Sequence, residues 1–170
     1  MPDSLTIRAA TPGDLPALHL VIERAYRGDA ARGGWTHEAD LIPEGARTDL
    51  ATLQAIVADP AQRLLVALDN DIPIGCVQVT DKGNERAYLG LLCVDPALQA
   101  AGLGKKLVAA AENCARATFG ARVMEMTVID ARIELIAYYE RRGYLNSGEK
   151  RDFVIPLDPP LFMDVLVKDL

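Results

Sequence analysis

The chain has 170 residues, of which 50% are hydrophobic and 25% are charged, and its formal net charge is −6. A chain of this length fits a single domain over residues 1–170, and it buries roughly two-thirds of its unfolded surface. The acidic balance argues against a nucleic-acid groove, which needs a basic patch for the phosphates, and it favours small, often cationic partners.

The first half of the chain predicts one strand, two helices and a hairpin. Alternation of apolar and polar side chains indicates the strands, and apolar residues at three- and four-residue spacing indicate the helices. In chain order, the predicted elements are a strand over 5–8, a helix over 15–22, a helix over 50–57, and hairpin strands over 64–68 and 72–79.

The segment 27–49 between the two helices has no period, because four glycines interrupt it. A loop of this length in a compact domain is commonly functional. It contains Trp35, His37 and Glu38, and an exposed aromatic ring beside a carboxylate can bind a primary amine through cation–π contact and charge pairing. The alternative is that Trp35 closes an edge of the core and that Glu38 is solvated.

A strand over 88–94 ends at Asp95 and leads through a Gly-rich turn into a helix that Gly120 ends. Gly102 and Gly104 leave the first free N–H groups of this helix open to a ligand. Those groups and the positive end of the helix dipole form an anion site, which suits a phosphate or pyrophosphate. The turn matches neither a P-loop nor a dinucleotide fingerprint, because the glycines that those motifs require are missing.

The last part of the chain predicts a strand-helix-strand unit over 87–129, which requires a right-handed parallel crossover, and then a helix and two strands. These elements are a strand over 122–129, a helix over 132–142, and strands over 144–155 and 162–168. The whole pattern predicts a mixed α/β domain with a central, partly antiparallel sheet.

The residue types exclude several other classes of protein. The two histidines and the missing Gly-x-Ser-x-Gly motif leave a serine hydrolase or a histidine metal site without the residues it needs, so we expect no metal. Cys76, Cys93 and Cys114 lie far apart in apolar runs and are predicted to be reduced core residues. Since the sequence contains neither a signal peptide nor a long apolar run, we expect a cytoplasmic protein without membrane contact.

Two segments together resemble the GNAT superfamily of N-acetyltransferases. The turn Gln99-Ala-Ala-Gly102-Leu-Gly104 follows a Val-Asp-Pro sequence and precedes a helix, as the acyl-CoA loop of that superfamily does. Residues 137–144, Ala-Tyr-Tyr-Glu-Arg-Arg-Gly-Tyr, resemble the family's signature of a Tyr-Glu pair followed by a basic residue, Gly and an aromatic residue. The one helix and one strand that separate the two segments also match the order of elements in the family.

The resemblance implies a three-layer α/β domain of α+β type, whose mixed, mostly antiparallel sheet is splayed between its fourth and fifth strands. It also implies an enzyme that moves the acetyl group of acetyl-CoA to the amine of a small molecule, an amino acid or a peptide N-terminus by direct attack. No nucleic acid, membrane or metal is implied, and a homodimer is compatible with it. The alternative is a non-catalytic acyl-CoA sensor or interaction domain that keeps the loop.

Site residues follow from the resemblance. Tyr139 is expected to protonate the departing CoA thiolate, with Tyr138 pointing elsewhere. Glu85 and Tyr88, at the start of the strand that ends at the loop, are candidates for the general base. Many members carry Asn where this chain has Arg132, which either reaches the CoA phosphates or an acidic group of the acceptor, or is solvated. The residues implied in acetyl-CoA binding are Leu92, Cys93, Val94, Gln99, Ala100, Ala101, Gly102, Leu103, Gly104, Lys105 and Arg132.

Overall fold

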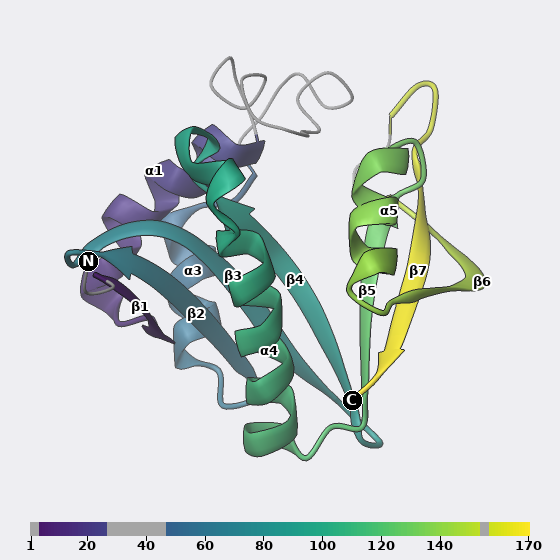
Figure 1. Cartoon of the computed structure of the whole chain (residues 1–170), viewed down its shortest axis with the longest axis horizontal. Helices are drawn as coiled ribbons and strands as arrows, with labels where there is room; N and C mark the ends of the chain where they lie inside the picture. Colours follow the sequence, from purple (N-terminus) through teal and green to yellow (C-terminus); the bar gives the residue numbers. More distant parts are fainter. Residues whose placement is uncertain (1–3, 27–46, 154–156) are drawn as a thin grey trace.

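A computed structural model describes residues 4–26, 47–153 and 157–170 of the chain (Figure 1). The helices are α1 (Leu15–Tyr26), α3 (Leu50–Ala58), α4 (Leu103–Phe119) and α5 (Ile133–Arg141), with short 3-10 helices at Pro12–Asp14 and Pro96–Ala101. The strands are β1 (Leu5–Ala9), β2 (Gln62–Asp69), β3 (Ile72–Gly83), β4 (Arg86–Val94), β5 (Val123–Ile129), β6 (Leu145–Asp152) and β7 (Phe162–Asp169). None of the helices in these described ranges is long and apolar enough to cross a membrane.

The strands form one sheet in the order β1-β2-β3-β4-β5-β7-β6. Every neighbouring pair is antiparallel except β4 and β5, which are parallel and are connected through α4. The prediction of a mixed, mostly antiparallel sheet is therefore confirmed.

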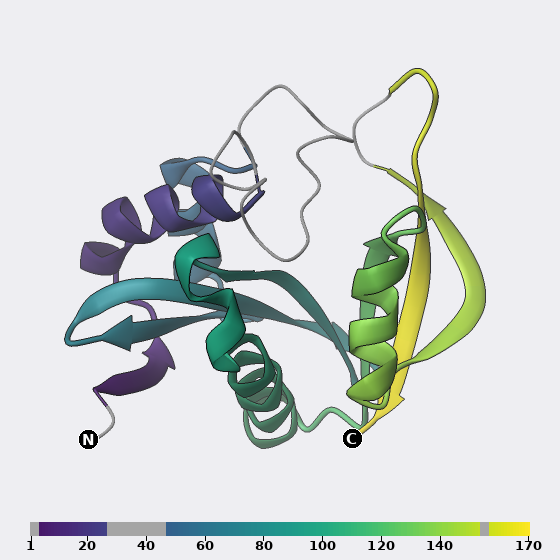
Figure 2. The same cartoon turned by 45° about the horizontal axis from the view of Figure 1, so that its top comes forward.

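Helices cover both faces of this sheet, and the alternation of apolar side chains along β2 explains why. Leu65 and Ala67 belong to the core under α4 and α5, whereas Leu64, Val66 and Leu68 belong to a second core under α1 and α3. Successive side chains of a strand point to opposite faces, so an apolar strand of this kind can be buried on both sides. In Figure 2, α1 and α3 lie above β2 and β3, and α4 lies below them, which gives the predicted three layers.

β4 contains a bulge at Leu91. Gly90 pairs with Gln78 and Cys93 pairs with Cys76, so two residues of β4 lie opposite one residue of β3. Leu91 has a φ of 49°, which a branched side chain adopts only under tertiary constraint. The bulge reverses the alternation of faces, because Leu89 packs on the α4 side while Leu91 packs on the α1 side.

β4 and β5 are paired only at their first residues and then diverge. Only three pairs join them, from Arg86 with Val123 to Tyr88 with Glu125, and the remaining residues of the two strands do not pair with each other. Figure 1 shows the two strands diverging from their common end near the C-terminus. The predicted splay between the fourth and fifth strands is thus present, and it leaves two inner strand edges without ladder partners.

The expectation that Glu85 lies at the start of β4 is wrong. Glu85 does not lie on the strand, because Asn84 and Glu85, with φ of 54° and 61°, form the turn that reverses the chain from β3 into β4. Two successive residues of positive φ are typical of a type I′ hairpin turn. The carbonyl of Glu85 accepts hydrogen bonds from the amides of Arg122 and Val123, at the end of the sheet where β4 and β5 are still paired.

Candidate active site

The splay between β4 and β5 holds two cavities, of about 300 Å³ and about 240 Å³. Small-molecule sites start at roughly this size. We call them the strand cavity, which is lined by both diverging strands, and the loop cavity, which is lined by the Gly-rich turn and the start of α4. Of the residues that the structure describes, five line both of them, namely Tyr26, Leu92, Arg132, Leu135 and Tyr139, so the two cavities adjoin.

The Gly-rich turn forms one wall of the loop cavity. Gly102 has a φ of 76°, in the left-handed region, and a Cβ atom there would meet no atom within 4 Å. The first α4 amide bonded within the helix is that of Lys106, which donates to the Gly102 carbonyl at 3.3 Å. The amides before it have no acceptor within the helix, and amides at a helix start of this kind can bind an anion.

Among the described residues, three cations line the loop cavity, namely Lys105, Arg132 and Arg142. The guanidinium of Arg142 lies over the ring of Tyr138, with its carbon 4.8 Å from the ring centroid. Three positive charges around the free end of a helix favour a ligand with several negative charges. A diphosphate fits this description, and a neutral or cationic ligand does not.

Tyr139 on α5 lies where the two cavities meet. Its side chain is 5% exposed, and its ring packs edge-on against the ring of Tyr144 with centroids 6.1 Å apart. Burial raises the pKa of the Tyr139 phenol well above its usual range, although the nearby charge of Arg132 acts in the opposite direction. The hydroxyl therefore carries its proton at neutral pH.

The expectation that Tyr138 points away from the site is wrong. Tyr138 lines the loop cavity beside Tyr139, and the two rings meet edge to face with their centroids 5.4 Å apart. A Cβ atom on Gly104 would lie 3.1 Å from the Tyr138 hydroxyl, so Gly104 also keeps space for this phenol. The 100° between neighbouring side chains of a helix sends the two tyrosines to different parts of one cavity rather than to opposite faces.

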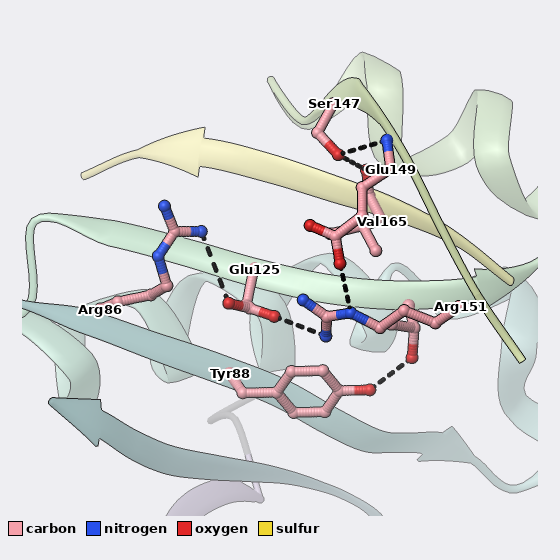
Figure 3. A network of polar contacts seen from close by, with 8 residues as sticks. Arg86, Tyr88, Glu125, Ser147, Glu149, Arg151 and Val165 are labelled. Atoms are coloured by element: carbon pink, nitrogen blue, oxygen red, sulfur yellow. Dashed lines mark hydrogen bonds and ion pairs between the residues drawn. The ribbon is translucent and has the colours of Figure 1, made fainter. Parts of the chain in front are cut away.

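A polar group lies in the strand cavity near the point where the ladder between β4 and β5 stops. Tyr88 and Thr127, which come from β4 and β5, share a hydrogen bond between their hydroxyls, and both line the cavity. Beside them Glu125 is only 3% exposed and forms ion pairs with Arg86 at 3.4 Å and Arg151 at 2.9 Å (Figure 3). These contacts fasten β4, β5 and β6 to one another at the point where the ladder between β4 and β5 stops.

The opposite wall of the cavities comes from the end of α1. The hydroxyl of Tyr26 donates a hydrogen bond of 2.5 Å to the carbonyl of Leu92, on the part of β4 that β5 has left. Arg47 lies over the ring of Tyr26, with its guanidinium carbon 4.9 Å from the ring centroid. Tyr26 therefore connects α1 to the free strand edge.

Most of the predicted residues in the described part of the chain gather at this site. Lining residues of the loop cavity include Leu92, Cys93, Val94, Gly102, Gly104, Lys105 and Arg132. Gln99, Ala100 and Ala101 lie in the 3-10 helix before Gly102. Leu103 is buried in the core, and Trp35, His37 and Glu38 lie outside the described residues.

Of the two candidates for the general base, only Tyr88 lines a cavity. The carboxylate of Glu85 is 62% exposed, lies 3.7 Å from Arg122, and lines neither cavity. No sequence motif predicts three further lining residues of the strand cavity, Tyr26, Arg47 and Thr127, because they come from distant segments. Within the described ranges, no group of three or more His, Cys, Asp or Glu side chains could hold a metal ion.

Comparison with known proteins identifies a match to the model of the acetyltransferase (GNAT) family over residues 21–144. A comparison with curated proteins finds no match. The structure is similar to that of the ribosomal-protein-S18-alanine N-acetyltransferase from Escherichia coli, at 17% identity and a TM-score of 0.74, over 97% of this chain and 93% of that chain.

Two further solved structures are similar over nearly the whole chain. One is the acetyltransferase of the GNAT family from Streptococcus pneumoniae, at 20% identity and a TM-score of 0.72, with 98% of this chain and 99% of that chain covered. The other is yncA from Salmonella typhimurium with its cofactor acetyl-CoA, at 20% identity and a TM-score of 0.72, with 98% and 94% covered. At these identities the similarity concerns the fold.

Proposed function

The chain belongs to the acetyltransferase (GNAT) family, and we propose that it transfers the acetyl group of acetyl-CoA to the amine of a small molecule, an amino acid or a peptide N-terminus. The observation that carries this proposal is the meeting of two cavities at Tyr139. One cavity has the charge and the backbone donors for a diphosphate, and the other has room for an acceptor.

In this proposal the loop cavity binds the CoA diphosphate. The free amides at the start of α4 donate to its oxygens, and Lys105 and Arg142 neutralise its charge. The free edge of β4, at Leu92, Cys93 and Val94, offers main-chain groups to the amides of the pantetheine arm. An N–H group of this edge near the acetyl carbonyl would also stabilise the oxyanion that forms there.

Tyr139 is the proposed general acid. The amine attacks the thioester carbonyl carbon, a C–N bond forms, the C–S bond breaks, and the leaving thiolate takes the phenol proton of Tyr139. Burial supports this role, because it keeps the proton on the phenol at neutral pH until the thiolate appears. The position of Tyr139 at the junction of the two cavities puts it beside both reactants in this proposal.

The amine must lose a proton before or during the attack, because an ordinary amine with a pKa near 10 is protonated at neutral pH. Of the residues predicted for this task, Tyr88 is the one whose side chain can contact the acceptor, since Glu85 lines neither cavity. We therefore keep Tyr88 as the candidate base and drop Glu85.

Two measurements test the proposal. Acetyl-CoA at about 100 times its dissociation constant should stabilise the protein by roughly 2.7 kcal/mol in thermal unfolding, whereas NAD at the same concentration should not. CoA release should then be followed with a panel of amines, amino acids and peptides. Stabilisation without turnover on any acceptor would favour the alternative, a non-catalytic acyl-CoA sensor, and stabilisation by NAD alone would contradict both functions.

A further inference from the structure

The strand cavity has a charge opposite to that of the whole chain. The protein has 24 acidic and 18 basic residues. Among the described residues that line the strand cavity, however, the charged ones are Arg47 and Arg132, and none is a carboxylate. A cavity with this lining attracts an anionic group and repels a polycation.

Arg47 is held in place by contacts that leave its guanidinium at the cavity wall. The carboxylate of Glu23 on α1 accepts hydrogen bonds from the main-chain amides of Arg47 and Thr48, at 2.8 and 3.1 Å. Thr48 is fixed further through its carbonyl, which lies 2.9 Å from Nε2 of His19. The carboxylate of Glu23 thus fixes the backbone at Arg47 and Thr48, and the side chain of Arg47 packs on the Tyr26 ring.

The position of Arg47 relates it to the reacting centre of the proposed function. Its guanidinium lies over the ring of Tyr26, and the hydroxyl of Tyr26 is bonded to the Leu92 carbonyl. Leu92 lies on the free edge of β4 and lines both cavities. An acceptor in the strand cavity that presents its amine at the junction can therefore place a second group, a few bonds away, beside Arg47.

Resting on the proposed acetyl transfer, we infer that the acceptor is an amine that also carries an anionic group, in the simplest case a carboxylate, and that Arg47 binds this group. A guanidinium binds a carboxylate through two parallel N–H···O bonds, which fixes the orientation of the molecule as well as its charge. Arg132 adds positive charge where the two cavities meet. Arg47 is then a specificity-determining residue.

The experiment compares acceptors that share one carbon skeleton. L-Leucine, L-leucinamide and 3-methylbutylamine form one set, L-phenylalanine, its amide and phenethylamine form a second, L-methionine and its amide form a third, and spermidine represents polycations. The measured quantity is kcat/KM from CoA release at saturating acetyl-CoA. We expect each acid that turns over to exceed its amide by at least roughly tenfold, which corresponds to about 1.4 kcal/mol.

Arg47→Gln tests the assigned residue. The preference for acid over amide should fall by roughly 10- to 100-fold, mainly through KM, because the variant loses a charge-assisted contact but keeps a polar side chain. The amide measured on the same variant is the internal reference for folding and for acetyl-CoA binding. Arg116→Gln is the matched control, since Arg116 lies on the exposed face of α4 and bonds to Asn113 at 2.7 Å, and it should keep the wild-type preference.

The outcomes separate this inference from the proposed function. Turnover of amides, simple amines or spermidine at rates equal to or above those of the acids would overturn the inference and leave acetyl transfer intact. An acid preference that survives Arg47→Gln would overturn the role of Arg47. If no member of the panel is acetylated, the proposed transfer to amines itself fails, and the inference fails with it.

Discussion

The hydroxyl of Tyr88 on β4 and the hydroxyl of Thr127 on β5 share a hydrogen bond just beyond the last backbone pair of these strands, which is Tyr88 with Glu125. A hydrogen bond between two side chains thus connects β4 and β5 just after the last pair that the main chain makes. The contact lies where the splay begins, and both side chains line the strand cavity.

Removing either hydroxyl should destabilise the protein by a similar amount. We expect Tyr88→Phe and Thr127→Val each to lower the free energy of unfolding by about 1 kcal/mol, because each leaves the other hydroxyl without this partner. Urea unfolding of the two single variants and the double variant forms a cycle, in which the double variant should lose little more than the larger single one. Additive losses would show that the two hydroxyls act independently.

Tyr139→Phe should lower kcat by roughly 10²- to 10⁴-fold with little change in acetyl-CoA affinity, since the ring remains and only the proton donor is lost. Tyr138→Phe is the matched control, because Tyr138 lines the loop cavity but not the strand cavity. It should change kcat by only a few-fold. A Tyr139→Phe enzyme with normal turnover, in a reaction whose chemical step limits the rate, would leave Tyr139 as a packing residue.

Gly102→Val should abolish the stabilisation by acetyl-CoA. A side chain there occupies the approach of the diphosphate to the α4 amides, and it strains a backbone with a φ of 76°. Gly83→Val is a control for the strain alone, because Gly83, the last residue of β3, has a φ of 77° and an equally open environment. Both variants should unfold more easily, but Gly83→Val should keep the full acetyl-CoA shift. A loss of that shift in both variants would attribute it to strain.

The stability of the protein should fall in alkaline solution, above pH about 10. Burial raises the pKa of Tyr139 and, together with Glu112, the pKa of Tyr144. A group whose pKa is higher in the folded state stabilises fully below its unfolded pKa, and this contribution is lost as the pH rises above that value. Each tyrosine should therefore lower the free energy of unfolding by about 1.4 kcal/mol for each pH unit above its unfolded pKa. The free energy of unfolding, measured with urea from about pH 9 to about pH 11, should decline less steeply with pH in Tyr139→Phe than in the wild type. Equal slopes would contradict the assignment.

Local sequence features predicted the parts of the site that local chemistry dictates. Gly102 marks a left-handed turn and Gly104 a close approach, and Tyr139 belongs to a segment with a clear helical period. Apolar runs also predicted the strands, and the splayed sheet was correctly expected from the resemblance. The turn, the helix and the individual strands are set by residues that are close together in the chain.

The remaining features depend on contacts between distant segments. Leu91 occupies a positive φ that its side chain disfavours, so the bulge has no local signal and exists because the neighbouring strands impose it. Tyr26 meets Leu92 across 66 positions, and Arg47 reaches the cavity through its contacts with α1. The turn at Asn84 and Glu85 lacks the glycine that usually identifies a tight hairpin, which is why Glu85 was expected on the strand.

The two cavities adjoin at the residues they share, which include Tyr139 and Leu92, but one extends to the start of α4 and the other extends between the diverging strands. Each substrate of the proposed reaction therefore has its own compartment, and both can be present at once. Steady-state kinetics should accordingly be sequential: double-reciprocal plots for one substrate at several concentrations of the other should intersect. Parallel lines, the pattern of a ping-pong mechanism, would require an acetylated side chain as an intermediate.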